Sequence, residues 1–336
     1  MRASSLFLFR QDGDATIGRV PVTDTARNSI AFVAPGEDPA RWLPLLRAAL
    51  PRERFHPWPE IPDPAAIDVA LVARPPEGAL RGFTNLKLIQ SLWMGVDGLL
   101  ADPTLPREVP LARMVDPGML AAMSETVLAC VLDWHRNLHR YRAQQSARLW
   151  RALPQLLASD RTVGLLGLGE LGRDAAAKLL GLGFKVCGWS RRPKTLPGLE
   201  CLSGNDGMRE VLARSGALVC LLPLTAQTHG ILNARTLELL PEGACVINVG
   251  RGAHLVERDL LAALDSGRLA HAWLDVFETE PLPAAHPFWM HPGVTLTPHV
   301  AALTEPRTAL VKIVANVERV RRGEPPADLI DRQTGY

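Results

Sequence analysis

A glycine-rich turn after an apolar run constrains the fold of this chain more than any other feature. Residues 163–166 are apolar, Gly167, Gly169 and Gly172 follow in Gly-x-Gly-x-x-Gly spacing, and residues 173–182 have a helical pattern. In such a turn the first glycine permits a tight bend, the second lets a pyrophosphate approach bare backbone, and the third lets the helix pack on the strand. Glycine clusters also mark ordinary turns, but the flanking strand and helix patterns favour a dinucleotide-binding fold, whose helix N-terminus attracts phosphate.

Strand and helix patterns alternate along most of the chain. The strands expected outside the glycine turn are residues 29–34, 69–72, 86–92, 184–189, 217–222, 244–249, 270–276 and 294–297. This alternation predicts an α/β fold with two doubly wound parallel-sheet domains. We expect a Rossmann-type nucleotide domain at residues 102–301, inserted in a flavodoxin-like substrate domain of residues 29–101 and 302–336. A helix expected at residues 304–322 returns the chain to the substrate domain.

Composition excludes several classes of partner. The net charge of the 336 residues is only +2 and no run of like charge occurs, so nucleic acid and an anionic membrane are poor partners. No apolar run approaches the roughly 20 residues that cross a bilayer. Five scattered cysteines without a Cys-x-x-Cys pair favour a reduced, cytoplasmic protein without a metal site. Residues 1–28 form an N-terminal extension, either a hairpin of 6–9 with 17–22 or a loose tail, to which no chemistry is assigned.

The segment after the expected strand 184–189 predicts the choice of cofactor. Ser190, Arg191 and Arg192 stand where NAD enzymes place an acid that holds the ribose 2′-hydroxyl. A hydroxyl and two guanidinium groups match a 2′-phosphate instead, so we expect NADP(H) to be preferred, with NAD(H) as a possible second cofactor. The alternative is a basic surface loop.

Two charged residues at strand ends are candidates for a site. Arg251 lies between Gly250 and Gly252 after the strand 244–249, which leaves its guanidinium free to bind a substrate carboxylate. The alternative is a surface arginine in a turn. Asp275 ends another apolar strand, where a carboxylate costs free energy unless it has a partner. We therefore expect Asp275 to belong to the site.

His299 and Glu280 form a candidate acid–base pair. His299 follows the last expected strand, and Glu280 lies in the preceding loop. A lone histidine is more often structural, but a glutamate beside it fixes its tautomer and favours its charged form. His286 and His291 lie in a proline-rich loop, and no spacing of histidines or carboxylates predicts a metal.

A long helix expected at residues 117–149 predicts a homodimer. It is apolar along one side over a length that a single domain does not cover, and Trp150 follows it. The alternative is a helix that packs across the cleft between the two domains of one chain.

Five motifs occur in a fixed order, at residues 167–172 (GLGELG), 222–225 (LPLT), 248–252 (NVGRG), 274–277 with 280–282 (LDVF and EPL), and 298–299 (PH). In this order they resemble the motifs of the D-isomer-specific 2-hydroxyacid dehydrogenases, over nearly the whole chain from residue 29. Residues 187–191 (CGWSR), 299–302 (HVAA) and 335–336 (GY) resemble the glyoxylate/hydroxypyruvate reductase A branch of that family.

The resemblance implies a role for each candidate residue. Arg251 binds the carboxylate and carbonyl oxygen of the substrate, and His299, oriented by Glu280, is the proton donor in reduction. The backbone at Met94 and Gly95 binds the carboxylate from the other domain. The residues expected to contact the cofactor are Gly167, Gly169, Glu170, Leu171, Gly172, Ser190, Arg191, Arg192, Leu222, Pro223, Thr228, Val249, Gly250 and, beside the nicotinamide, Asp275.

Two residues depart from the pattern of the family. Trp93 stands where the substrate loop usually has a small residue, and Ala73 stands where the reductase A branch has a tryptophan facing the substrate. Both departures change the space that is left for the substrate. The extension before residue 29 has no counterpart.

These observations predict an enzyme that reduces small 2-oxo acids with NADPH. The expected reactions are glyoxylate to glycolate and hydroxypyruvate to glycerate. One alternative is a dehydrogenase of the same superfamily with another substrate, such as formate or phosphite. The other is a nucleotide-sensing protein without catalysis, against which the complete set of Arg251, Glu280 and His299 argues, because a sensor needs no proton donor.

Overall fold

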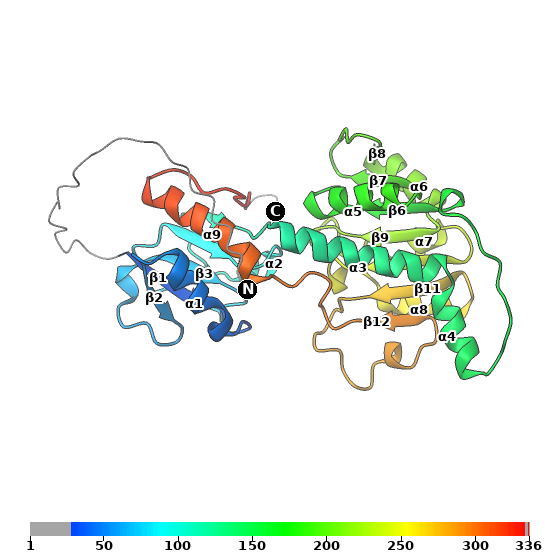
Figure 1. Cartoon of the computed structure of the whole chain (residues 1–336), viewed down its shortest axis with the longest axis horizontal. Coiled ribbons are helices and arrows are strands. Elements are labelled where there is room, and N and C mark those ends of the chain that lie inside the picture. The colour runs from blue at the N-terminus through cyan, green and yellow to red at the C-terminus, as the bar shows by residue number, and fades with distance from the viewer. Residues whose placement is uncertain (1–27, 333–334, 336) are drawn as a thin grey trace, which may run out of the picture.

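The computed structural model describes residues 28–332 and 335, which form two lobes, each built on a parallel sheet (Figure 1). Apart from residue 28, the N-terminal extension and its alternative hairpin lie outside the described residues. The two parallel sheets confirm the predicted α/β class with two parallel-sheet domains. Short 3₁₀ turns complete the description, at Pro64–Ala66, Ala158–Asp160, Gly252–His254 and Pro287–Trp289.

The first sheet has the strand order β2-β1-β3-β4-β5, which is the flavodoxin-like order. Its strands are β1 (Ser29–Val33), β2 (Arg54–Pro57), β3 (Ile67–Val72), β4 (Leu88–Ser91) and β5 (Leu111–Ala112). One face packs on α1 (Pro39–Ala49) and α9 (Pro306–Arg321), and the other on the loop after β3 and on α2 (Asp97–Ala101). The carboxyl ends of β1, β3 and β4 therefore lie side by side at one edge.

The C-terminal helix α9 returns to the first sheet, as the sequence predicts. Asn316 of α9 donates from its side-chain amide to the side-chain oxygen of Gln90 in β4, at 2.7 Å. Arg321 at the end of α9 forms ion pairs with Glu53, at 2.6 Å, and with Asp68. All three charged side chains are largely buried, so removing one of them would leave a buried charge without its partner.

The first lobe extends further along the chain than the expected boundary after residue 101. β5 pairs with β4, and Leu105, Leu111 and Met114 join the core of this lobe. A strand of two residues has too short a pattern to be recognised in a sequence, and the three prolines of residues 103–116 indicate an extended crossing instead.

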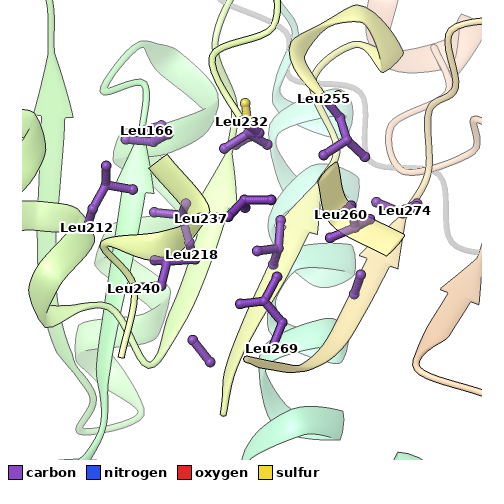
Figure 2. Packing of buried hydrophobic residues seen from close by; sticks show 14 of the residues in the cluster. Leu166, Leu212, Leu218, Leu232, Leu237, Leu240, Leu255, Leu260, Leu269 and Leu274 are labelled. Carbon is purple, nitrogen blue, oxygen red and sulfur yellow. The ribbon is translucent and has the colours of Figure 1, made fainter. Parts of the chain in front are cut away.

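The second sheet has the order β12-β11-β10-β9-β6-β7-β8, which is the Rossmann order with one further strand at the β12 edge. Its strands are β6 (Thr162–Leu166), β7 (Lys185–Ser190), β8 (Glu200–Ser203), β9 (Ala217–Cys220), β10 (Ala244–Asn248), β11 (Leu269–Leu274) and β12 (Val294–Leu296). Figure 2 shows the leucine-rich core between one face and α6 (Gly204–Arg214), α7 (Ala234–Glu238) and α8 (Glu257–Asp265). The other face packs on α3 (Pro117–His135) and α5 (Glu170–Gly181).

The single helix expected over residues 117–149 is wrong, because the chain breaks it in two. α3 ends at His135, Asn137 adopts a left-handed conformation with φ 58°, and α4 (Leu138–Ser146) continues in a new direction (Figure 1). Asparagine tolerates that conformation better than most residues do. Arg142 of α4 then donates two hydrogen bonds to Asp133 of α3, at 2.6 and 3.1 Å, which hold the two helices together.

Within residues 28–332 no helix is long and apolar enough to cross a membrane. The five cysteines are free, and four of them are buried. Burial raises the pKa of the Cys130, Cys187 and Cys220 thiols to about 12, 11 and 12, so these side chains stay protonated and unreactive.

Candidate active site

The glycine turn between β6 and α5 has room for a phosphate group. Gly167 has φ 107°, and a Cβ at this position would lie 2.7 Å from the carbonyl oxygen of Leu221. A Cβ at Gly172 would overlap the carbonyl of Gly167, so helix and strand pack as closely as the backbone allows. At Gly169 a Cβ would meet nothing within 4 Å, and no side chain caps the helix that begins at Glu170. The open backbone and the uncapped helix start therefore fit a pyrophosphate.

The end of β7 carries basic groups and no carboxylate. Ser190 is buried and donates its hydroxyl hydrogen bond to the carbonyl of Arg192, at 2.7 Å, which orders the loop. Lys194, which the sequence reasoning missed, reaches back to the glycine turn and donates to the carbonyl of Leu168, at 2.7 Å. Its place four residues after Ser190 in the same basic segment is the signal that points to it. The loop fits a 2′-phosphate better than a free 2′-hydroxyl.

The loop after β9 faces the glycine turn. Leu222 is buried, and Thr228 fixes the loop by donating its hydroxyl to the carbonyl of Pro223, at 2.7 Å, while it accepts from the backbone N–H of Thr225, at 2.8 Å. Because β9 lies next to β6 in the sheet, this loop and the glycine turn border the same crevice.

Arg251, at the end of β10, bridges the two lobes. Its Nε donates to Oδ1 of Asp97 in α2, at 3.0 Å, and its Nη1 donates to the carbonyl of Gly250, at 2.8 Å. The other end of the guanidinium lies against Gly95, where any side chain would overlap it. The structure therefore places Gly95 and Arg251 together, as expected for a shared carboxylate site. Asp97 was not among the site residues expected from the sequence. Its position two residues after Gly95 is the feature of the sequence that could have identified it.

His254 is a third residue that the sequence analysis did not predict. Its ring is fully buried; Nδ1 accepts from the backbone N–H of Arg251, at 3.0 Å, and Nε2 lies 3.2 Å from the carbonyl of Pro223. Burial lowers the pKa of His254 to about 4, so the ring is neutral and its Nε2–H donates to Pro223. The ring thus ties the loop of Arg251 to the loop after β9.

His299 and Glu280 form the expected pair. His299 Nδ1 lies 2.8 Å from Glu280 Oε2, and the other carboxylate oxygen accepts from the backbone N–H of Phe277, at 3.0 Å. The side chain of His299 is 42% exposed, and among the described residues none hydrogen-bonds to its Nε2. His299 has φ 55°, a strained conformation of the kind found at functional sites. Nε2 is therefore presented to solvent while Nδ1 is held.

Asp275 holds the loop that carries His299. Its carboxylate is buried and accepts from the Thr297 hydroxyl, at 2.7 Å, and from the backbone N–H groups of Val300 and Ala301, at 2.9 and 3.0 Å. Its own backbone carbonyl accepts from the N–H of His299, at 2.8 Å. The three bonds to the carboxylate compensate the burial of its charge, and together with the bond to the carbonyl they fix the position of His299.

The remaining histidines of the proline-rich loop lie apart from this pair. His286 contacts Glu257, at 3.1 Å, and His291 contacts Asp265, at 3.2 Å. In the described part of the chain no group of three or more histidine, cysteine or carboxylate side chains could hold a metal ion. Arg251, Asp275 and His299 follow β10, β11 and β12, which are neighbours in the sheet, so they share the edge where parallel sheets bind ligands.

Comparisons with known proteins agree with this geometry. The family model described as "D-isomer specific 2-hydroxyacid dehydrogenase, NAD binding domain" matches residues 128–301. A glyoxylate/hydroxypyruvate reductase A of Yersinia enterocolitica is 42% identical over 313 residues, covering 92% of this chain and 100% of the relative. The reductase A of Serratia proteamaculans is 43% identical over 313 residues, with the same coverage.

Solved structures of similar proteins share the fold. A D-isomer specific 2-hydroxyacid dehydrogenase of Xanthobacter autotrophicus, solved with NADPH and MES, has a TM-score of 0.89 and 41% identity over 93% of this chain and 100% of that chain. An NADPH-dependent glyoxylate/hydroxypyruvate reductase of Sinorhizobium meliloti, solved with NADP and sulfate, has a TM-score of 0.87 and 37% identity over 92% of this chain and 100% of that chain. The chain belongs to the D-isomer specific 2-hydroxyacid dehydrogenase family.

Proposed function

We propose that this protein reduces small 2-oxo acids with NADPH, converting glyoxylate to glycolate and hydroxypyruvate to glycerate. The observation that carries the proposal is the contact of the Arg251 guanidinium with Gly95 of the other lobe, at the sheet edge that also bears the His299–Glu280 pair. The relatives from Yersinia and Serratia, which bear the name of this activity, support the choice of substrates.

The cofactor site is assigned to the glycine turn and the loops beside it. Gly169 and the start of α5 hold the pyrophosphate, while Ser190, Arg191 and Arg192, with Lys194 beside them, surround the 2′-phosphate. The full set of cofactor residues remains the one expected from the sequence, with Asp275 near the nicotinamide. When bound, NADPH supplies a hydride to the carbonyl carbon of the substrate. The NADPH and NADP in two similar solved structures support this assignment.

Arg251 has two tasks in the proposed reaction. Its guanidinium binds the substrate carboxylate together with the backbone of Met94 and Gly95, and it stabilises the negative charge that grows on the carbonyl oxygen. Asp97 holds Nε of Arg251 and leaves the end near Gly95 for the substrate. Because the anchor comes from both lobes, closure of the lobes assembles it and excludes water.

His299 donates the proton that completes the reduction. The proton leaves from Nε2, which none of the described residues occupies, and moves to the carbonyl oxygen of the substrate. Glu280 holds Nδ1 at 2.8 Å, which fixes the ring and stabilises its positive charge before the transfer. A nucleotide sensor needs no such donor, so the pair favours an enzyme over a sensor.

A panel of substrates tests the proposed function. Oxidation of NADPH is followed by absorbance with glyoxylate, hydroxypyruvate and larger 2-oxo acids, and formate and phosphite are tested in the opposite direction with NADP. We expect turnover with glyoxylate and hydroxypyruvate and none with formate or phosphite. Absence of turnover with every 2-oxo acid would contradict the proposal.

We further propose that the chain forms a homodimer through α3, α4 and the segment after them. Leu149, Trp150 and Leu157 are exposed by 47%, 102% and 71%, which is unusual for side chains that a single copy should bury. A largely apolar groove of about 440 Å³ lies between α3, α4 and the sheet and includes Leu132 and Trp273. A second copy that laid its own exposed segment there would cover both surfaces.

The cellular location and the domain limits are also proposals. Free, mostly buried thiols suit the reducing cytoplasm, where we place the protein. We assign residues 29–115 and 302–336 to the substrate domain and residues 116–301 to the cofactor domain, since β5 joins the first sheet. Small 2-oxo acids are the expected partners, and neither nucleic acid nor a membrane is expected.

A further inference from the structure

A tryptophan in the substrate loop is held by the neighbouring strand ends. Trp93 follows β4, and its indole Nε1 donates to Oε1 of Glu37, at 2.8 Å, in the turn after β1. Glu37 also accepts from the indole of Trp42 in α1, at 2.9 Å. The ring of Trp93 lies over Gly36, where a Cβ would stand 3.7 Å from it. Trp93 is therefore a fixed wall at the carboxyl edge of the first sheet.

Arg74, two residues after the end of β3, places its positive charge over this wall, whose indole N–H is held by the Glu37 carboxylate. Its guanidinium carbon lies 5.7 Å from the centre of the Trp93 ring, within the range of a cation–π contact. Arg74 is exposed, and no ion pair within residues 28–332 includes its guanidinium. A ligand can therefore approach it.

The backbone of Arg74 is held in an unfavourable conformation. Its φ is 46°, in the left-handed region, although Pro75 follows it and a residue before proline normally adopts extended backbone. Such strain persists where surrounding structure imposes it, and it concentrates at ligand sites. At Arg74 the result is that the side chain turns toward Trp93.

The position of Arg74 relative to Arg251 suggests what ligand it takes. Trp93 and Gly95 are two residues apart, so their Cα atoms are at most about 7 Å from each other. At one end of this short loop the backbone of Gly95 lies against the guanidinium of Arg251, and at the other end the ring of Trp93 lies 5.7 Å from the guanidinium carbon of Arg74. A substrate whose first carboxylate is bound at Gly95 thus meets an indole face and then a second cation.

We propose that Arg74 binds a second anionic group of the substrate, so that 2-oxo dicarboxylates are better substrates than 2-oxo monocarboxylates of the same length. The proposal rests on the proposed function and narrows its substrate class. Arg251 and Gly95 bind the carboxylate next to the carbonyl, Trp93 packs on the methylene carbons, and Arg74 binds the distal carboxylate. A charged hydrogen bond between the exposed Arg74 guanidinium and the distal carboxylate should favour the diacid by about tenfold in kcat/KM.

The test compares pairs of substrates that differ only at the distal end. Oxaloacetate is paired with 2-oxobutanoate and 2-oxoglutarate with 2-oxopentanoate, and kcat/KM is measured with NADPH at low and high salt. Arg74→Gln removes the charge and keeps a long polar side chain. Arg47→Gln is the matched control, because Arg47 is an exposed arginine in the last turn of α1, outside the cluster around Trp93.

We expect the wild-type enzyme to prefer each diacid by about tenfold, and high salt to reduce this ratio, since screening weakens an exposed ion pair. Arg74→Gln should bring the ratio close to one, mainly through a higher KM for the diacid, and Arg47→Gln should leave it unchanged. A wild-type ratio of one or less, or a ratio that Arg74→Gln leaves intact, overturns the inference while glyoxylate reduction upholds the proposed function. Failure to reduce any 2-oxo acid overturns both.

Discussion

At the scale of single residues, the site depends on side chains that are each held by a second group. Glu280 holds His299, Asp97 holds Arg251, and Asp275 holds the loop of His299. Preorganisation of this kind lets a charged group act on a developing charge without first moving. The loss of activity on removing a residue should therefore depend on whether that residue contacts the substrate itself or only positions another residue that contacts it.

Arg251→Ala should raise KM for glyoxylate sharply and also lower kcat, with a loss of at least about 10²-fold in kcat/KM. In the proposed reaction the guanidinium binds the carboxylate in the ground state and the growing oxygen charge in the transition state, so both constants should change. The matched control is Arg258→Ala, because the Arg258 side chain is 89% exposed in α8. An Arg251→Ala enzyme with the kinetics of the control would show that the carboxylate binds elsewhere.

Two buried histidines should make stability depend on pH. Burial lowers the pKa of both His254 and His271 to about 4, below the usual value near 6.5. Both are neutral in either state above pH 6.5, and as the pH falls toward 4 the unfolded chain takes up protons that the folded chain does not. The free energy of unfolding should therefore fall by about 2 kcal/mol per histidine between pH 7 and pH 5.

Urea unfolding at pH 7 and pH 5 measures this loss. His254→Gln replaces the ring with an uncharged amide, so the variant should lose about 2 kcal/mol less than the wild type over the same interval, whatever its stability at pH 7. Equal losses in the two proteins would mean that His254 is charged in the folded state.

These residues also mark the limit of what the sequence could predict. Arg251 and His299 stand at recognisable strand ends, and Glu280 lies in the loop before the last strand. The structure brings Glu280 to His299 and Arg251 to Gly95. Lys194, Asp97 and His254 were missed because their roles come from contacts with distant segments: Lys194 with Leu168, Asp97 with Arg251, and His254 with Pro223.

At the scale of elements, buried strands were predictable, whereas three of the four short edge strands were not. The patterns of β1, β6, β7, β9, β10 and β11 are continuous apolar runs, because both faces of a parallel sheet are covered. β2, β5 and β8 lie at or near sheet edges with two to four residues, too few for a periodic signal. The break between α3 and α4 was also invisible, since Asn137 is neither glycine nor proline.

The loop after β7 should determine the preference for NADPH. Replacing both Arg191 and Arg192 by alanine should raise the KM for NADPH far more than the KM for NADH, because only NADPH carries the 2′-phosphate. The wild-type enzyme should show a higher kcat/KM with NADPH. Equal values for the two cofactors in the wild-type enzyme would refute this account of the loop.

At the scale of the whole molecule, the exposed apolar side chains after α4, Leu149, Trp150 and Leu157, lead us to expect that a second copy covers them. We expect light scattering at micromolar concentration to give twice the chain mass of 36.6 kDa. Trp150→Asp should weaken the dimer, because Trp150 is fully exposed in one copy and a charge there opposes burial. A wild-type mass near 36.6 kDa would contradict the dimer and favour the alternative, in which α3 packs only against the domains of its own chain.

The two lobes meet through Arg251 and Gly95. In the proposed reaction the cofactor, the substrate anchor and the proton donor therefore come together only in the complete chain. The first lobe contributes the substrate loop, and the second contributes the glycine turn and the three strand ends with Arg251, Asp275 and His299. Closure of the lobes is then a condition of the reaction.

The most direct test of this account is the kcat of His299→Ala for glyoxylate reduction with saturating NADPH. If His299 is the proton donor, kcat falls by roughly 10²- to 10⁴-fold while NADPH binding, measured by fluorescence, is retained. Glu280→Gln should cost less and move the alkaline limb of the rate profile to lower pH, because the imidazolium loses its charged partner. A folded His299→Ala enzyme that keeps the wild-type kcat and pH profile would show that another group donates the proton, and the central claim would be wrong.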